Sequence, residues 1–261
     1  MHRLTGFVLF CGIIYAGITA ILYAQQTRLI YPSPDIVSPL PDGFEEVFLQ
    51  TADGLELRSF YRRAGAGQPT VVYFHGNGGT LYGSVVATEQ VAALGYGLLL
   101  VEYRGYGGNA GTPCEQGFYA DGRAALAFLT GQDIAKGQII VMGNSIGTGT
   151  AVQLATEISP KALVLSAPFT SLPDAASEVL WWLPVRPLIR DTYDNASKIG
   201  QITAPTLIVH GSNDTLIPYQ HGEALAEAGP AAEFILFDAE GHDLIFTPAV
   251  QAAQAAWLAA L

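Results

Sequence analysis

The chain opens with its longest apolar run, which reaches from Leu4 to Ala24 without a charged residue and is bracketed by Arg3 and Arg28. As an α-helix, these twenty-one residues would span roughly 31 Å, close to the hydrocarbon thickness of about 30 Å. The apolar region of a cleaved signal peptide is usually shorter, about 7–15 residues. The pattern therefore predicts a retained single-pass anchor over residues 1–27. A signal peptide and a buried helix of a soluble fold are the alternatives.

Charges at the two ends of this run bear on its orientation. The amino group and Arg3 favour a cytoplasmic N-terminus, but Arg28 nearly balances them. We expect the rest of the chain to lie outside the cytoplasm. From Gln25 to Asp42, four prolines predict an extended connector rather than a helix.

Beyond the connector, short apolar runs alternate with stretches of helical periodicity. The runs predict strands at Glu45–Gln50, Leu55–Tyr61, Thr70–Phe74, Gly97–Val101, Gln138–Met142, Ala162–Leu165, Thr206–Val209 and Glu233–Phe237. Helices are expected at 80–93, 116–130, 147–158, 218–228 and 248–261. The first two runs flank a turn and read as an antiparallel pair. The later runs are nearly continuous in hydrophobicity, which is typical of a parallel sheet covered on both faces. Residues 28–261 thus predict a doubly wound α/β sheet, whose ligands bind at the carboxyl ends of the strands.

One interval, residues 168–203, is too long for a plain crossover and too apolar for a solvated loop. We interpret it as a short cap over the site. Its apolar side chains are predicted to line a pocket for an acyl chain, and they are Trp181, Trp182, Leu183, Leu188 and Ile189. The alternative is that both tryptophans pack on an edge of the sheet.

Composition excludes some classes of function. The net charge is −11 and the chain has only three lysines, so little is available to neutralise nucleic-acid phosphates. The five histidines are scattered and no paired-cysteine or His-Glu-x-x-His spacing occurs, so we expect no metal site. Cys11 lies in the N-terminal apolar run and Cys114 in a polar loop about 100 residues later, so no disulfide between them is predicted.

The chemistry-bearing motif is Gly143-Asn144-Ser145-Ile146-Gly147, directly after an apolar run. A buried strand, a sharp turn with one serine between two glycines and a following helix form a nucleophile elbow. The glycines let strand and helix pass closely, and the turn exposes the serine hydroxyl. Ser145 is therefore the predicted nucleophile.

A serine hydroxyl needs a base, and the base needs an acid that orients it. His242 follows the last predicted strand by a short loop and is the predicted base, whereas His221 sits within a helical stretch. Asp214 follows the preceding strand and is the predicted acid. Asp238 and Asp243 are the alternative acids. His210, before a glycine at a strand end, is interpreted as structural.

A second glycine-rich turn, His75-Gly76-Asn77-Gly78-Gly79, follows an apolar strand. The backbone N–H groups of Asn77 and Ile146 are predicted to form an oxyanion hole. Such a turn could also hold a phosphate, but it lacks the lysine of a nucleotide-binding loop.

Five motifs occur together in one order, and they resemble the α/β-hydrolase superfamily: His75–Gly79, Glu102–Gly107, Gly143–Gly147, His210–Pro218 and Gly241–Asp243. The chain is most similar to the membrane-anchored bud-emergence-type branch, whose animal relatives include protein depalmitoylases. The resemblance implies the same triad, Ser145, Asp214 and His242. Two positions depart from the branch, which typically has aspartate at Glu102 and serine at Cys114. Dehalogenases and epoxide hydrolases of this fold have an aspartate in place of Ser145.

Together these features predict a membrane-anchored serine hydrolase that cleaves an ester or thioester, with an acyl or lipid-like substrate and without a cofactor. An acyltransferase or a serine peptidase would use the same triad. An inactive binding module is the alternative from another class. The acyl chain and the leaving group stay open at this point.

Overall fold

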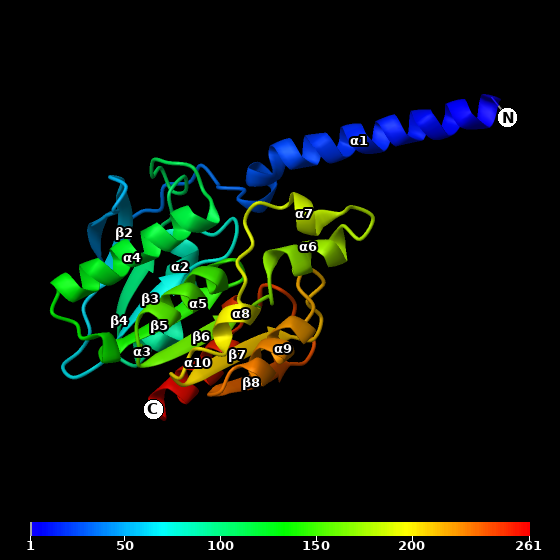
Figure 1. Ribbon diagram of the computed structural model, residues 1–261. Helices are drawn as coiled ribbons and strands as arrows, with labels where there is room; N and C mark the ends of the chain where they lie inside the picture. Colours follow the sequence, from blue (N-terminus) through cyan, green and yellow to red (C-terminus); the bar gives the residue numbers. More distant parts are fainter. Residues whose placement is uncertain (1) are drawn as a thin grey trace.

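The centre of the molecule is an eight-stranded sheet in the order β1-β2-β4-β3-β5-β6-β7-β8 (Figure 1). The computed structural model describes residues 2–261. The strands are β1 (Glu45–Gln50), β2 (Glu56–Arg62), β3 (Thr70–Phe74), β4 (Gly97–Val101), β5 (Ile139–Asn144), β6 (Ala162–Ser166), β7 (Thr206–Gly211) and β8 (Ala232–Phe237). β1 pairs antiparallel with β2, and β2 antiparallel with β4. All pairs from β3 to β8 are parallel. The predicted α/β architecture with an antiparallel N-terminal strand pair is confirmed.

Helices cover both faces of this sheet. One face packs against α4 (Glu115–Gly131), α5 (Gly147–Glu157), α8 (Ala196–Ile199) and α9 (Gln220–Ala228). The other packs against α2 (Leu81–Ala87), α3 (Glu89–Ala93) and α10 (Pro248–Ala259). The described residues also include two 3₁₀ turns, Lys136–Gln138 and Leu244–Phe246. Because side chains alternate along a strand, neighbours in β3 enter opposite cores: Val72 joins the first and Val71 the second.

The N-terminal helix is longer than predicted. α1 runs from His2 to Ile30, so the extended connector begins at Tyr31 instead of Gln25. The physical reason is Pro32, since the residue before a proline is pushed out of helical geometry, whereas nothing between 25 and 30 breaks a helix. α1 is long and apolar enough to cross a membrane and its apolar window is not buried against the protein. It projects away from the sheet (Figure 1).

The interval 168–203 forms two structures. Its first part makes α6 (Leu172–Val179) and α7 (Val185–Leu188), which lie at the same end of the molecule as α1 (Figure 1). Its second part returns to the main body, where Tyr193 is fully buried and α8 packs against α5 and α9. We refer to α6, α7 and the loop between them, residues 172–188, as the cap.

Polar contacts join α1 to the cap and to the irregular segment that follows it. The hydroxyl of Tyr15 donates to the carbonyl oxygen of Trp182 at 3.0 Å. Gln26, which is buried, donates to the Leu188 carbonyl oxygen at 3.3 Å and accepts from the Arg190 amide at 2.9 Å. These bonds hold the C-terminal half of α1 against the cap.

Candidate active site

Ser145 stands at the sharp turn between β5 and α5. Its φ is +51°, a left-handed backbone conformation that is strained for residues other than glycine. A Cβ on Gly147 would sit 2.2 Å from the carbonyl oxygen of Phe74, and one on Gly143 would sit 2.6 Å from that of Gly147. Only glycine fits at either position, so the spacing noted in the sequence is a packing requirement.

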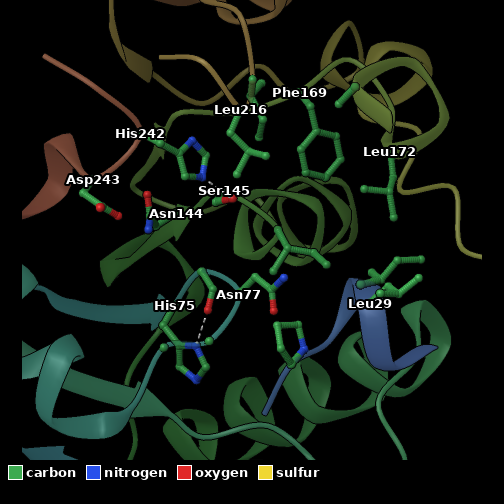
Figure 2. Close-up of a pocket in the computed structure, with 18 of the residues that line it drawn as sticks. Leu29, His75, Asn77, Asn144, Ser145, Phe169, Leu172, Leu216, His242 and Asp243 are labelled. Atoms are coloured by element: carbon green, nitrogen blue, oxygen red, sulfur yellow. Dashed lines mark hydrogen bonds between the residues drawn. The ribbon is translucent and has the colours of Figure 1, made fainter. Parts of the chain in front are cut away.

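The structure brings Ser145, His242 and Asp214 together from three different strand ends. The Ser145 hydroxyl lies 2.9 Å from His242 Nε2, and His242 Nδ1 lies 2.7 Å from Asp214 Oδ2. Because a carboxylate only accepts, Nδ1 carries the proton and Nε2 accepts from the serine. Figure 2 shows the imidazole of His242 beside Ser145.

The carboxylate of Asp214 accepts other hydrogen bonds besides the one from His242. Its other oxygen, Oδ1, accepts from the amides of Leu216 and Ile217, each at 2.9 Å. Burial alone would raise the pKa of this carboxyl group, but hydrogen bonds from His210, His242 and Ile217 outweigh burial and hold its pKa below the usual value. Asp214 therefore stays ionised beside the imidazole.

Among the described residues, the other candidates from the sequence make no hydrogen bond to Ser145 or His242. Asp238 accepts from Ser212 and the Ala239 amide at the surface. The Thr170 amide donates to His221 Nδ1 at 3.2 Å, and the Thr170 hydroxyl, 2.8 Å from the same nitrogen, donates to Asp174 Oδ2 at 2.9 Å. His210 is fully buried, and its Nε2 donates to the Ile217 carbonyl oxygen at 2.9 Å.

Asn77 and Ile146, the predicted oxyanion donors, both line the same cavity as Ser145. Among the described residues, neither amide N–H has an intramolecular acceptor. The Asn77 side chain accepts from the Tyr106 hydroxyl at 3.2 Å, which fixes the turn. A Cβ on Gly76 would sit 2.9 Å from Asn144 Nδ2, so this turn approaches the elbow more closely than an alanine would allow.

A buried His75–Glu102 pair supports that turn, and the sequence analysis missed it. His75 Nε2 donates to Glu102 Oε1 at 2.8 Å, and Glu102 Oε2 accepts from the Leu81 amide at 3.3 Å. Both side chains are at most 3% exposed. The signal was present in the sequence, because His75 and Glu102 each follow directly after a predicted parallel strand, β3 and β4. The carboxyl ends of neighbouring parallel strands meet at one edge of a sheet.

A cavity of about 700 Å³ lies over Ser145 and His242. None of the five residues predicted to line it does so: Trp181, Trp182, Leu183, Leu188 and Ile189 are absent from its lining. The cap turns at Leu180, which leaves Trp181 81% exposed on the outside and Leu183 buried elsewhere. Part of the apolar lining comes from α6 and the residue after it, with Leu172, Ala175, Ala176, Val179 and Leu180, and from α1, with Leu22, Leu29 and Ile30. Phe169, Leu216, Ile217 and Phe246 also line the cavity.

Comparison with protein families gives two matches. The serine aminopeptidase family S33 matches residues 66–193, and the alpha/beta hydrolase fold family matches residues 186–249. The chain belongs to the α/β-hydrolase superfamily. An uncharacterized protein of Mycobacterium tuberculosis is 36% identical over 241 residues, which cover 89% of this chain and 85% of the relative.

Two further relatives of this α/β-hydrolase come from a plant and a fish. The α/β-hydrolase domain-containing protein WAV2 of Arabidopsis thaliana is 28% identical, over 89% of this chain and 86% of that protein. The zebrafish (Danio rerio) lysophosphatidylserine lipase ABHD12 is 29% identical, over 69% of this chain and 51% of that protein. Among solved structures, the Pyrococcus furiosus esterase Pf2001 has a TM-score of 0.70 at 18% identity, covering 87% of this chain and 96% of that one. That likeness shows the shared fold.

Proposed function

We propose that the protein is a membrane-anchored serine hydrolase that cleaves carboxylic esters or thioesters through an acyl-enzyme. The observation that carries the proposal is the continuous chain of hydrogen bonds from Asp214 through His242 to Ser145, at the wall of an apolar cavity. A polar nucleophile and base inside apolar walls suit a substrate with one ester group on a hydrocarbon chain.

The chemistry follows from this geometry. Ser145 Oγ attacks the carbonyl carbon while His242 Nε2 accepts its proton, and Asp214 stabilises the imidazolium that forms. The free N–H groups of Asn77 and Ile146 donate to the oxyanion. The intermediate collapses as the alcohol or thiol leaves with the proton from His242. Water, deprotonated by His242, then releases the carboxylic acid and restores Ser145.

The anchoring part of the proposal is supported by α1. It has the length and composition of a membrane span, and most of its large apolar side chains are exposed. The charges around it favour a catalytic domain outside the cytoplasm, with residues 1–27 as the anchor and 28–261 as the hydrolase domain. Such an anchor would hold the cavity close to the lipids of the membrane.

A serine peptidase is the second candidate, because the family that matches residues 66–193 carries that description. An aminopeptidase must bind a free amino group, which requires carboxylates in the pocket. Among the described residues that line the cavity, Asp243 is the only carboxylic acid. The apolar lining therefore favours acyl substrates over peptides.

The test is reaction of the purified full-length protein with a fluorophosphonate probe, followed by assay on p-nitrophenyl esters, acyl thioesters and amino-acid p-nitroanilides. We expect labelling of Ser145, loss of labelling in Ser145→Ala, and turnover of esters or thioesters. The matched control is Ser197→Ala, an exposed serine whose hydroxyl donates only to the Asp194 carbonyl oxygen. Equal labelling of the Ser145→Ala protein would refute the proposal, and preferred turnover of the anilides would favour the peptidase.

A further inference from the structure

The membrane helix contributes directly to the cavity that holds Ser145. Leu22, Leu29 and Ile30 of α1 line this cavity together with the candidate nucleophile and base. Leu22 and Leu29 are seven residues apart and so lie on one face of α1, about 10 Å along its axis. Figure 2 shows Leu29 across the view from His242.

The wall beside α1 is the helix α6 of the cap. Its lining residues Leu172, Ala175, Ala176 and Val179 are spaced three, four and seven residues apart, which places them on one helical face. Ser145 lies deeper, at the sheet. The cavity therefore passes between the end of α1 and the inner face of α6.

This arrangement is held in place by polar bonds rather than by apolar contact alone. Gln26 lies between Leu22 and Leu29 in sequence and bonds to the chain on both sides of Ile189, at Leu188 and Arg190. The guanidinium of Arg190 lies 4.5 Å from the centre of the Tyr23 ring. The part of α1 that carries Leu22 and Leu29 is thus held against the cap and Arg190, and the Leu29 side chain is 59% exposed.

The outer surfaces on both sides of this passage are apolar. On α1, Ile18 is 42% and Ile21 is 65% exposed, and in the loop of the cap Trp181 is 81% exposed. Trp side chains concentrate where hydrocarbon meets headgroups. The uncharged run of α1 ends at Ala24, so the stretch from Leu22 to Leu29 lies at that same boundary.

The α1 residues that line the cavity, Leu22, Leu29 and Ile30, are all uncharged. Among the described residues that line the cavity, only Asp243 belongs to the Asp, Glu, Lys and Arg group, and it is next to His242. A hydrocarbon chain is therefore the part of a substrate that this side accepts, and the polar part of the substrate must point elsewhere.

Resting on the hydrolase function proposed above, we propose that the end of α1 forms a wall of the acyl-binding site. The acyl chain of an ester or thioester residing in the bilayer passes between α1 and α6 to reach Ser145, and Leu22 and Leu29 set the chain length that is accepted. The anchor is thus a specificity element as well as an attachment.

An alkyl chain attached covalently to Ser145 tests directly whether α1 lies beside the acyl chain. Full-length wild-type protein is treated with a long-chain alkyl fluorophosphonate that carries a diazirine near the end of its chain, then irradiated, and the crosslinks are mapped by mass spectrometry. We expect crosslinks to the segment 22–30. Crosslinks confined to residues outside this segment would overturn the proposal that α1 forms a wall of the acyl site. Reaction of Ser145 with the probe would still support the proposed hydrolase function. Failure of Ser145 to react would overturn both.

A kinetic test uses substitutions on α1 in lipid nanodiscs. The ratio of kcat/KM for p-nitrophenyl palmitate to that for the butyrate should fall at least tenfold in Leu29→Trp, because the larger side chain fills the passage. The matched control is Ile21→Trp, on the same helix but outside the cavity lining. It should keep the wild-type ratio within twofold. An unchanged ratio in Leu29→Trp would contradict the proposal.

Discussion

The ring of His75 and the carboxylate of Glu102 form a pair inside the protein, with 2.8 Å between Nε2 and Oε1 and almost no solvent contact. The same carboxylate accepts from the Leu81 amide, so it ties both ends of the turn that carries Asn77. A Cβ on Gly107 would sit 2.6 Å from Glu102 Oε2, which shows how closely the backbone encloses this group. The pair thus positions a predicted oxyanion donor from a neighbouring strand.

Removing this carboxylate is expected to affect both stability and activity. Glu102→Ala leaves two buried donors without partners and should lower the free energy of unfolding by about 3 kcal/mol. It should also lower kcat/KM, because the Asn77 turn loses its support. The matched control is Glu157→Ala, whose partly exposed pair with Arg123 should be worth at most about 1 kcal/mol. Urea unfolding and ester assays check both, and equal losses in the two variants would contradict this role for Glu102.

Substitution of the candidate base should lower kcat more than substitution of the candidate acid. His242→Ala is expected to reduce kcat by about 10³-fold or more, since His242 Nε2 is the nitrogen that is hydrogen-bonded to the Ser145 hydroxyl. Asp214→Asn should cost somewhat less, because a mispositioned imidazole keeps some function. Steady-state kinetics with a short ester measures both, with unchanged circular dichroism as the control for folding. Retention of more than a tenth of wild-type turnover by His242→Ala would show that another group is the base.

Gly147 offers a test of the elbow packing. Gly147→Ala would place a methyl group 2.2 Å from the Phe74 carbonyl oxygen, a contact that only a backbone shift can relieve. We expect a loss of about 3 kcal/mol or more, seen as poor soluble yield or a lower melting temperature. Gly131→Ala, also within a helix but facing open space, should be neutral or stabilising by up to about 1 kcal/mol. Similar behaviour of the two variants would contradict the close approach.

The stability of the cap region should depend on the protonation of His221. Burial lowers the pKa of His221, although Glu178 and Asp174 act in the opposite direction. A histidine with a lowered folded pKa stabilises the fold fully above its unfolded pKa of about 6.5, and this contribution is lost as the pH falls through the folded value.

His221→Asn removes this titration while keeping an acceptor for Thr170. Between about pH 7 and pH 5, the wild type should lose more stability than the variant, as measured by thermal unfolding at several pH values. Parallel curves for the two proteins would show that His221 does not titrate in this range.

The anchor has its own test. Full-length protein should sediment with membranes and resist carbonate extraction, whereas a chain starting at Ser33 should be soluble and still cleave short esters. Mass spectrometry of the mature N-terminus separates an anchor from a signal peptide. A mature chain starting near Gln25 would refute the retained helix.

Much of the architecture follows from the sequence alone. Continuous apolar runs such as Thr70–Phe74 can only be buried on both faces, and each forms a strand of the central sheet. The elbow around Ser145 was predictable because a tight turn between strand and helix requires glycines at fixed spacing. The expectation that Ser145, Asp214 and His242 meet followed from the position of each just after a parallel strand, because such strands end at one edge of the sheet. Their order along the chain is the one expected for this architecture.

Tertiary structure alone decided which apolar residues meet the cavity. Trp181 and Val185 lie four residues apart in the same apolar interval, yet Trp181 is exposed, Val185 is buried, and neither lines the cavity. Leu29 lines it from a helix more than a hundred residues away from Ser145 in sequence. Hydrophobicity determines that a side chain leaves water, but it is non-directional. Which surface a side chain meets depends on the bonds between α1 and the cap, such as those of Gln26, and these form only when the chain is folded.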